Sequence, residues 1–220
     1  MSENKLSAYC LKYAQSELSE SMIFHNGSAE KKQPISFAIY LIHINDKNIL
    51  VDAGCDTMPG FVMDWHLSPL CVLKQMGISA KQITDVVITH AHHDHIEAVK
   101  YFTTATIHIS KEAYEKGKKY IPDSFKISTF ENELVINPQI RVIECGGHSK
   151  GSSIVEIKTG DKIHIIAGDE CYTNANIENR ICTGTFYNKK NAIAFIEKYS
   201  SDKYRVHTCH DISLKTERII

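Results

Sequence analysis

The segment at residues 89–95, Thr-His-Ala-His-His-Asp-His, constrains this chain most, because four histidines and one aspartate fall within seven consecutive residues. The residues before it, 85–89, have the β-branched density of a buried strand, and residues 94–99 have the pattern of a first helical turn. The sequence therefore predicts that these side chains lie on a strand-to-helix loop. Such loops are where α/β proteins place their chemistry.

A mixed cluster of imidazole and carboxylate groups favours a first-row transition metal. Imidazole suits zinc, iron, copper and nickel, and carboxylate extends the choice to harder ions. His90 and His92, two residues apart in extended chain, face the same way, whereas Asp94 and His95 turn away as the helix begins. This geometry offers ligands to two metal ions. The alternative is a set of polar surface residues, or histidines that hydrogen-bond to one another.

Length and charge limit the number of domains and the kind of partner that this chain can have. The 220 residues, 43% of them hydrophobic, suit a single domain over residues 1–220. The net charge is −1 and the charged residues are mixed without long runs, so nothing indicates a nucleic-acid partner. We expect a small-molecule substrate, and the sequence leaves the oligomeric state open.

The chain shows no targeting or membrane signal. No run approaches 18 uninterrupted apolar residues, and the N-terminal residues lack the basic and apolar regions of a signal peptide, so we expect no membrane span and a cytoplasmic location. Seven scattered cysteines without a C-x-x-C pair favour reduced thiols over a disulfide framework. Most of them are expected to be small core residues.

The order of predicted elements indicates the fold class. Helical spacing predicts helices at residues 61–66, 69–76, 111–119 and 188–199. Apolar and alternating runs predict strands at residues 5–13, 35–44, 49–51, 85–89, 106–110, 134–136, 140–143, 153–158, 162–167 and 204–206, with a hairpin turn at 159–161. Along the chain, a part rich in strands is followed by a part that mixes strands and helices, and this order then repeats. The order fits two sheets packed face to face with helices outside.

Four more polar residues stand where apolar strand-like runs end: Asp52, His148, Asp169 and His210. Taken singly, each is typical of a turn, a loop or a helix cap. A structural zinc site is a competing interpretation for two of them, for example Cys145 with His148 and Cys209 with His210. That site would leave the histidines at residues 90–95 unexplained.

The pattern H-x-H-x-D-H, followed in order by a histidine, an aspartate and a histidine, resembles the metallo-β-lactamase superfamily, and V-D-A-G at residues 51–54 resembles the first motif of that superfamily. The resemblance implies an α/β fold, the four-layer αββα sandwich of two mixed β-sheets flanked by helices. It implies two divalent metal ions, zinc first, with iron or manganese also compatible. The metal ligands that it implies are His90, His92 and His148 for one ion, Asp94, His95 and His210 for the other, and Asp169 as the bridge.

The same resemblance gives the remaining positions their roles. It implies that Asp52 supports the metal site from behind the ligands, and that His93 and His207 are not ligands. The reaction implied is hydrolysis, in which a hydroxide bridging the two ions attacks an ester or lactone carbonyl. Asp94 could then return a proton to the leaving alkoxide.

Within the superfamily, the chain resembles the N-acyl homoserine lactonases best. Asp-Glu-Cys-Tyr-Thr-Asn at residues 169–174 resembles the lactonase segment whose tyrosine contacts the lactone, which makes Tyr172 a candidate oxyanion donor, although a core or rim tyrosine is the alternative. The chain departs from that branch at residues 96–98, Ile-Glu-Ala, where lactonases place small residues. A thioesterase resembling glyoxalase II, a phosphodiesterase or nuclease, and a metal-binding or sensing module remain alternatives. Ile23, Phe24, Phe61 and Trp65 are candidates to line an acyl pocket, although each is more simply a core residue.

Overall fold

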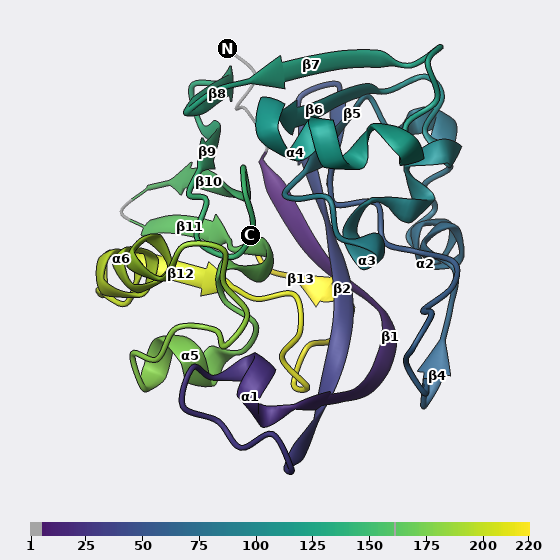
Figure 1. Cartoon of the computed structure of the whole chain (residues 1–220). Helices are drawn as coiled ribbons and strands as arrows, with labels where there is room; N and C mark the ends of the chain where they lie inside the picture. Colours follow the sequence, from purple (N-terminus) through teal and green to yellow (C-terminus); the bar gives the residue numbers. More distant parts are fainter. Residues whose placement is uncertain (1–5, 161) are drawn as a thin grey trace.

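The computed structural model describes residues 6–160 and 162–220, which form two facing β-sheets with helices on their outer sides (Figure 1). Residues 1–5, where the first predicted strand begins, and Asp161 of the predicted hairpin turn lie outside the described residues. A helix long and apolar enough to cross a membrane is not present in the part of the chain that the structure describes.

The first sheet combines an antiparallel half with a parallel half. Strands β1, β2 and β3 pair antiparallel, whereas β3, β5, β6 and β7 run parallel. In pairing order its strands are β13 (Glu217–Arg218), β1 (Ser7–Ser19), β2 (Lys32–Ile44), β3 (Lys47–Val51), β5 (Asp85–Ile88), β6 (Thr106–Ser110) and β7 (Lys126–Phe130), with β4 (Trp65–His66) paired to β1.

The second sheet is also mixed, because β11 and β12 pair parallel and the other neighbours antiparallel. Its strands in order are β12 (Tyr204–His207), β11 (Lys162–Ile166), β10 (Ser153–Thr159), β9 (Ile140–Glu144) and β8 (Glu133–Asn137).

Helices cover the outer face of each sheet. The α-helices are α1 (Glu20–Ile23), α2 (Pro69–Gln75), α3 (His93–Ile96), α4 (Lys111–Gly117), α5 (Asn174–Glu178) and α6 (Lys189–Tyr199), and the short 3-10 helices are η1 (Ala80–Gln82), η2 (Glu97–Tyr101), η3 (Lys118–Tyr120) and η4 (Gly168–Glu170).

Strand alternation explains the layers, because successive side chains point to opposite faces of a sheet. Val51 of β3 packs between the sheets with Val155 of β10, whereas its neighbour Leu50 packs on the other face in the cluster that includes Val72 of α2. On the far side of the second sheet, Ile165 packs with α6. These contacts confirm the predicted αββα sandwich.

One predicted helix is wrong and ends instead in strand β4, and two further strands, both at sheet edges, were not predicted. Residues 61–66 form no helix, because the backbone there hydrogen-bonds to β1, for example from Asp64 N–H to Gln15 O at 2.9 Å, and ends in β4. The missed strands, β7 and β13, are short edge strands whose polar residues give weak strand signals. The predicted helices at residues 69–76, 111–119 and 188–199 are confirmed in α2, α4 and α6.

Candidate metal centre

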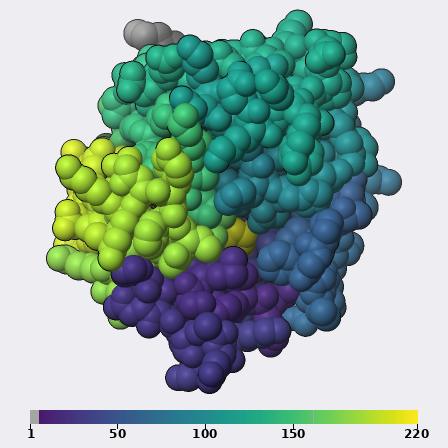
Figure 2. All heavy atoms as spheres, in the orientation of Figure 1, coloured from purple at the N-terminus to yellow at the C-terminus, as the bar shows by residue number. Residues whose placement is uncertain are grey.

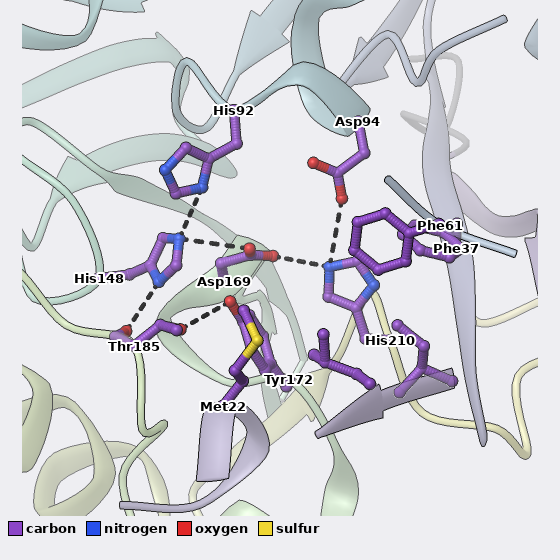
Figure 3. A pocket seen from close by; sticks show the side chains of 12 residues that line it. Met22, Phe37, Phe61, His92, Asp94, His148, Asp169, Tyr172, Thr185 and His210 are labelled. Carbon is purple, nitrogen blue, oxygen red and sulfur yellow. Dashed lines mark hydrogen bonds and ion pairs between the residues drawn. The ribbon is translucent and has the colours of Figure 1, made fainter. Parts of the chain in front are cut away.

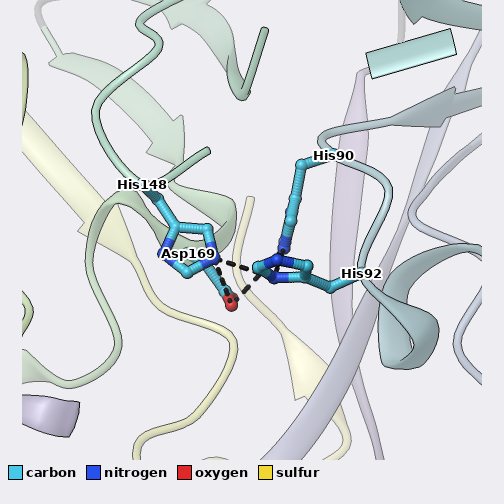
Figure 4. Close-up of side chains that lie close together, drawn as sticks. All are labelled: His90, His92, His148 and Asp169. Atoms are coloured by element: carbon cyan, nitrogen blue, oxygen red, sulfur yellow. Dashed lines mark hydrogen bonds and ion pairs between the residues drawn. The ribbon is translucent and has the colours of Figure 1, made fainter. Parts of the chain in front are cut away.

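A first group of four ligand atoms converges from three loops (Figure 4). His90 Nε2 lies 3.0 Å from His92 Nδ1, which in turn lies 2.9 Å from His148 Nε2. Asp169 Oδ2 completes the group, 3.5 Å from His90 Nε2 and 3.3 Å from His148 Nε2. His90 and His92 come from the loop after β5, His148 follows β9, and Asp169 follows β11 in η4.

A second group uses the other oxygen of the same aspartate. Asp169 Oδ1 lies 3.0 Å from both His95 Nε2 and His210 Nε2. Asp94 Oδ2 lies 3.5 Å from His95 Nε2 and 3.7 Å from His210 Nε2. Asp94 and His95 come from α3, and His210 follows β12. The two oxygens of Asp169 therefore face two different sets of ligand atoms.

These separations fit a divalent metal ion. A tetrahedral zinc site with metal–nitrogen bonds of about 2.0–2.1 Å puts its ligand atoms roughly 3.3 Å apart, close to the spacings in both groups. His95 Nε2 supports the fit, because this buried atom makes no well-aligned hydrogen bond among the described residues, although Asp169 Oδ1 lies 3.0 Å away. His95 Nδ1 is already bound to Asp52 at 2.7 Å, so the free nitrogen is left for a ligand.

Most of the histidine rings are oriented by a contact on the nitrogen that faces away from the group. His148 Nδ1 lies 3.0 Å from the Thr185 carbonyl oxygen, and His210 Nδ1 lies 2.9 Å from that of Ser36, so each Nδ1 donates its proton to that oxygen. Such outer contacts fix the tautomer and leave the inward nitrogen with a free lone pair. His92 differs, because it presents Nδ1 inward and its side chain is exposed.

The electrostatics of the cluster also suit a metal ion. Burial lowers the pKa of His148 to about 4 and holds the pKa of His90 well below its usual value, so both rings are neutral. Burial would raise the pKa of Asp169, but the surrounding histidines outweigh it and keep that pKa well below its usual range. Burial would lower the pKa of His95, yet the charges of nearby aspartates raise it, so this position favours a cation. The first group therefore offers the neutral imidazoles and ionised carboxylate that metal binding needs, whereas in the second group, where the aspartates also raise the pKa of His210, a metal ion would take the place of the protons.

Asp52 holds the ligand-bearing loop from behind. Its carboxylate accepts from Thr89 N–H at 2.7 Å and from the Thr89 hydroxyl at 2.9 Å, besides its contact with His95. Asp52 has a φ of +62°, a left-handed conformation that non-glycine residues adopt rarely and that often marks functional sites. The structure thus places Asp52 behind a candidate ligand, where the sequence predicted it.

The two groups lie beside a cavity of about 170 Å³ with one apolar wall (Figure 3). The apolar wall consists of Leu18, Met22, Ile35, Phe37 and Phe61. Figure 2 shows a hollow where the purple N-terminal, blue, teal and yellow-green segments meet, and each of these segments supplies lining residues of the cavity. Of the apolar residues predicted to line a pocket, Phe61 does so. Ile23, in contrast, is buried in the core, and Phe24 packs against that core. Trp65 is exposed on β4 and does not line the cavity.

Tyr172 lines the same cavity, 5% exposed, with its hydroxyl 2.7 Å from Thr185 Oγ1 (Figure 3). Burial, together with the charge of Asp169, raises the pKa of Tyr172 well above its usual value, so the phenol keeps its proton. A protonated phenol beside the ligand groups can donate a hydrogen bond to a bound molecule.

The metallo-beta-lactamase superfamily model matches residues 38–210, which span the strands and loops that carry every one of these ligand atoms. The chain belongs to the metallo-beta-lactamase superfamily. This membership makes a metal-dependent hydrolase the general class of the protein.

Relatives and solved structures agree with this family. A probable metallo-hydrolase of Methanocaldococcus jannaschii is 26% identical over 172 residues, covering 78% of this chain and 75% of that protein. The N-acyl homoserine lactonase AiiB of Agrobacterium fabrum is 22% identical over 180 residues, covering 64% of this chain and 65% of its own length. The structure of a quorum-quenching N-acyl homoserine lactone hydrolase covers 100% of both chains, with a TM-score of 0.84 at 20% identity. At that identity the likeness is one of fold.

The structure separates His93, His207 and Cys209 from the two candidate ligand groups. His93 turns away, with Nε2 2.9 Å from Thr57 O, and His207 Nε2 lies 2.9 Å from His164 Nδ1 between β11 and β12. The competing cysteine–histidine zinc site receives no support, since neither ligand group found among the described residues contains a cysteine. Cys209 instead packs in the core between the sheets.

Three residues that hold the candidate ligands in place were not predicted from the sequence. Ser36 and Thr185 act through backbone carbonyl oxygens, which any residue type provides, so no sequence signal exists for them. Glu170 had a signal, because it is a second acid directly after Asp169 at a strand end, and the structure buries it against the loop that carries His148.

Proposed function

We propose that this protein is a dinuclear metal-dependent hydrolase that cleaves an ester or lactone at its carbonyl, resembling the N-acyl homoserine lactonases. The observation that carries the proposal is Asp169, whose two oxygens face separate groups of ligand atoms beside an apolar cavity. Two divalent ions held there would generate a water-derived nucleophile near neutral pH and polarise the carbonyl. Zinc is our first choice, and the imidazole and carboxylate donors also admit iron or manganese.

The residues around the cavity have separate roles in this proposal. The Tyr172 phenol donates a hydrogen bond to the oxygen on which negative charge develops. Asp94, which lines the cavity with an 18% exposed side chain, would take the proton that the attacking water loses and return it to the leaving alkoxide. The apolar wall binds the acyl part and excludes water. The lining residues include no lysine or arginine, which favours a neutral substrate over a phosphodiester.

A side-by-side assay at pH 7 to 8 tests this proposal. The substrates are acyl homoserine lactones, simple esters, S-lactoylglutathione and bis-nitrophenyl phosphate, assayed with the wild type and Tyr172→Phe. We expect a lactone or ester to be hydrolysed fastest. We also expect Tyr172→Phe to lower kcat for lactones by up to about 100- to 1000-fold, the usual effect of losing one oxyanion donor, with unchanged metal content.

Three results of that assay would contradict the proposal in different ways. Much faster turnover of the thioester or the phosphodiester would replace the substrate assignment but keep the hydrolase. Unchanged lactone turnover in Tyr172→Phe would remove Tyr172 from the mechanism. An absence of metal-dependent turnover on every substrate would favour a metal-binding or sensing module.

We further propose that residues 1–220 form one domain and that the protein works in the cytoplasm. In support, both sheets share one buried cluster, and none of the seven cysteines is paired in the described part of the chain, as expected of a reducing compartment. Limited proteolysis that releases a stable fragment would contradict the single domain. Cell fractionation that recovers the protein outside the cytoplasm would contradict the cytoplasmic location.

A further inference from the structure

Glu170 is a buried acid beside the metal centre that belongs to neither ligand group. It follows Asp169 directly and is 1% exposed. Its Oε1 accepts hydrogen bonds from the backbone N–H groups of Gly147 at 3.0 Å and His148 at 3.2 Å, and also contacts the Ser152 hydroxyl. One carboxylate oxygen thus holds the loop that carries His148.

The glycine pair before His148 is explained by this contact. A Cβ atom on Gly147 would lie 2.2 Å from Glu170 Oε2 and 2.9 Å from the backbone nitrogen of Ala192 in α6. Real Cβ atoms do not approach other atoms so closely, so only glycine fits between the carboxylate and α6. Gly147 and Glu170 therefore fit together, because any larger residue at position 147 would collide with the Glu170 carboxylate.

The carbonyl side of the loop is held by different residues. Gly147 O accepts from Tyr187 N–H at 2.8 Å and from Asn188 N–H at 2.9 Å. These contacts join the loop to residues 187–188, whereas Glu170 joins it to the segment that carries Asp169. The distance that depends on Glu170 is therefore the 3.3 Å between His148 Nε2 and Asp169 Oδ2.

We propose that Glu170 is a positioning residue that sets the metal affinity of the group formed by His90, His92, His148 and Asp169. This inference rests on the metal-binding part of the proposed function and not on the substrate. The second group, Asp94, His95 and His210, is oriented instead by Asp52 and by the Ser36 carbonyl oxygen. Loss of the Glu170 carboxylate therefore frees the loop of His148 and weakens the metal position that uses this histidine, whereas Asp94, His95 and His210 keep their own supports.

Zinc titration against a competing chelator tests this inference on purified full-length protein. Glu170→Ala removes the acceptor, Glu170→Gln keeps Oε1 as an acceptor, and Ser152→Ala removes one of the three donors. Glu156→Ala is the matched control, because Glu156 is a buried acid, 3% exposed in β10, that pairs with Arg141 and contacts no candidate ligand. Thermal unfolding of each metal-free variant reports the effect on the fold.

We expect Glu170→Ala to weaken one zinc equivalent about 10- to 100-fold, as is usual when an outer partner of a ligand is lost, while the other equivalent is unchanged. Glu170→Gln should restore most of that affinity, and Ser152→Ala should show a smaller loss in the same equivalent. Glu156→Ala should unfold at a lower temperature but bind zinc like the wild type.

Other results overturn the inference. Wild-type affinity for both equivalents in Glu170→Ala would do so, as would equal weakening of both in proportion to lost stability. If Glu170→Ala does not fold, wild-type affinity in Ser152→Ala together with strongly weakened zinc binding in Glu170→Gln would also contradict it. A wild type that binds one zinc equivalent would refute the dinuclear proposal, while the affinity of that one ion would still test Glu170.

Discussion

Two groups of histidines in this molecule differ in the side chains and the space that surround them. At the metal centre, five histidine nitrogens converge on the oxygens of Asp169 and Asp94 beside a cavity. Between the sheets, His164 and His207 stack with ring planes 6° apart and share one hydrogen bond of 2.9 Å. Burial lowers the pKa of both of these rings, most strongly for His207, whose pKa falls to about 3. Carboxylates and a cavity, rather than histidine content, distinguish the candidate site.

The largest effect should come from removing the carboxylate that stands behind the metal centre. Asp52→Ala leaves His95 Nδ1 and the Thr89 N–H without their acceptor. We expect roughly 10- to 100-fold weaker binding of one zinc equivalent, from the misplaced ligand, and a loss of about 1–3 kcal/mol in the free energy of unfolding, from the unsatisfied buried donors. Chelator competition and urea denaturation measure the two quantities.

Asp85→Ala is a matched control for Asp52→Ala, because Asp85 is also a buried acid but contacts Lys47 and His108 instead of a ligand. It should lower the stability and leave zinc affinity unchanged. Equal zinc affinity in the two variants would show that Asp52 has no special connection to the metal centre.

A smaller effect should appear at the stacked pair, and only in acid. His207 faces His164 of β11 and Tyr40 of β2, with Arg205 on its own strand. Its folded pKa is about 3, below the unfolded value of about 6.5, so its neutral form contributes stability that is lost as the pH falls from about 6.5 towards 3. We expect His207→Gln to unfold at a lower pH than the wild type. Zinc affinity at pH 7 should not change, and a clear loss would contradict the distinction between the clusters.

The smallest effect should come from His93, which lies within the ligand run but turns away from it to Thr57 and Tyr120. Surface substitutions of this kind usually change free energies by no more than about 0.5 kcal/mol. His93→Gln should therefore keep the zinc affinity and turnover of the wild type within about twofold. A larger loss of either would mean that sequence position in the run, and not the direction of the ring, decides which histidines bind metal.

The strand ends could be predicted from the sequence because they carry strong local signals, whereas the grouping of the candidate ligands followed from the family resemblance. β-branched runs ended by polar residues located the strand ends at Asp52, His90 and Asp169, and the order of motifs linked them. The family match and the two facing sheets confirm the predicted family and fold. The roles of the individual ligands remain predictions for experiment.

Long-range contacts explain what the sequence could not predict. Most of the apolar wall is built by Leu18, Met22, Ile35 and Phe37, which look like ordinary strand and helix residues until β1, α1 and β2 bring them beside His210. Residues 61–66 have helix-like spacing, but pairing with β1 holds part of them extended. Ser36 and Thr185 orient ligands through backbone oxygens that carry no side-chain signal.

Metal content is the most direct test of the central claim, that Asp169 joins two metal positions. Protein prepared without chelator, as wild type and as Asp169→Ala, should be analysed for bound metal under the same conditions. We predict about two equivalents in the wild type, as in other two-metal hydrolytic sites, and clearly fewer in Asp169→Ala, because both groups lose an oxygen ligand. A wild type that holds one tightly bound zinc ion, with the same content and affinity in Asp169→Ala, would contradict the account.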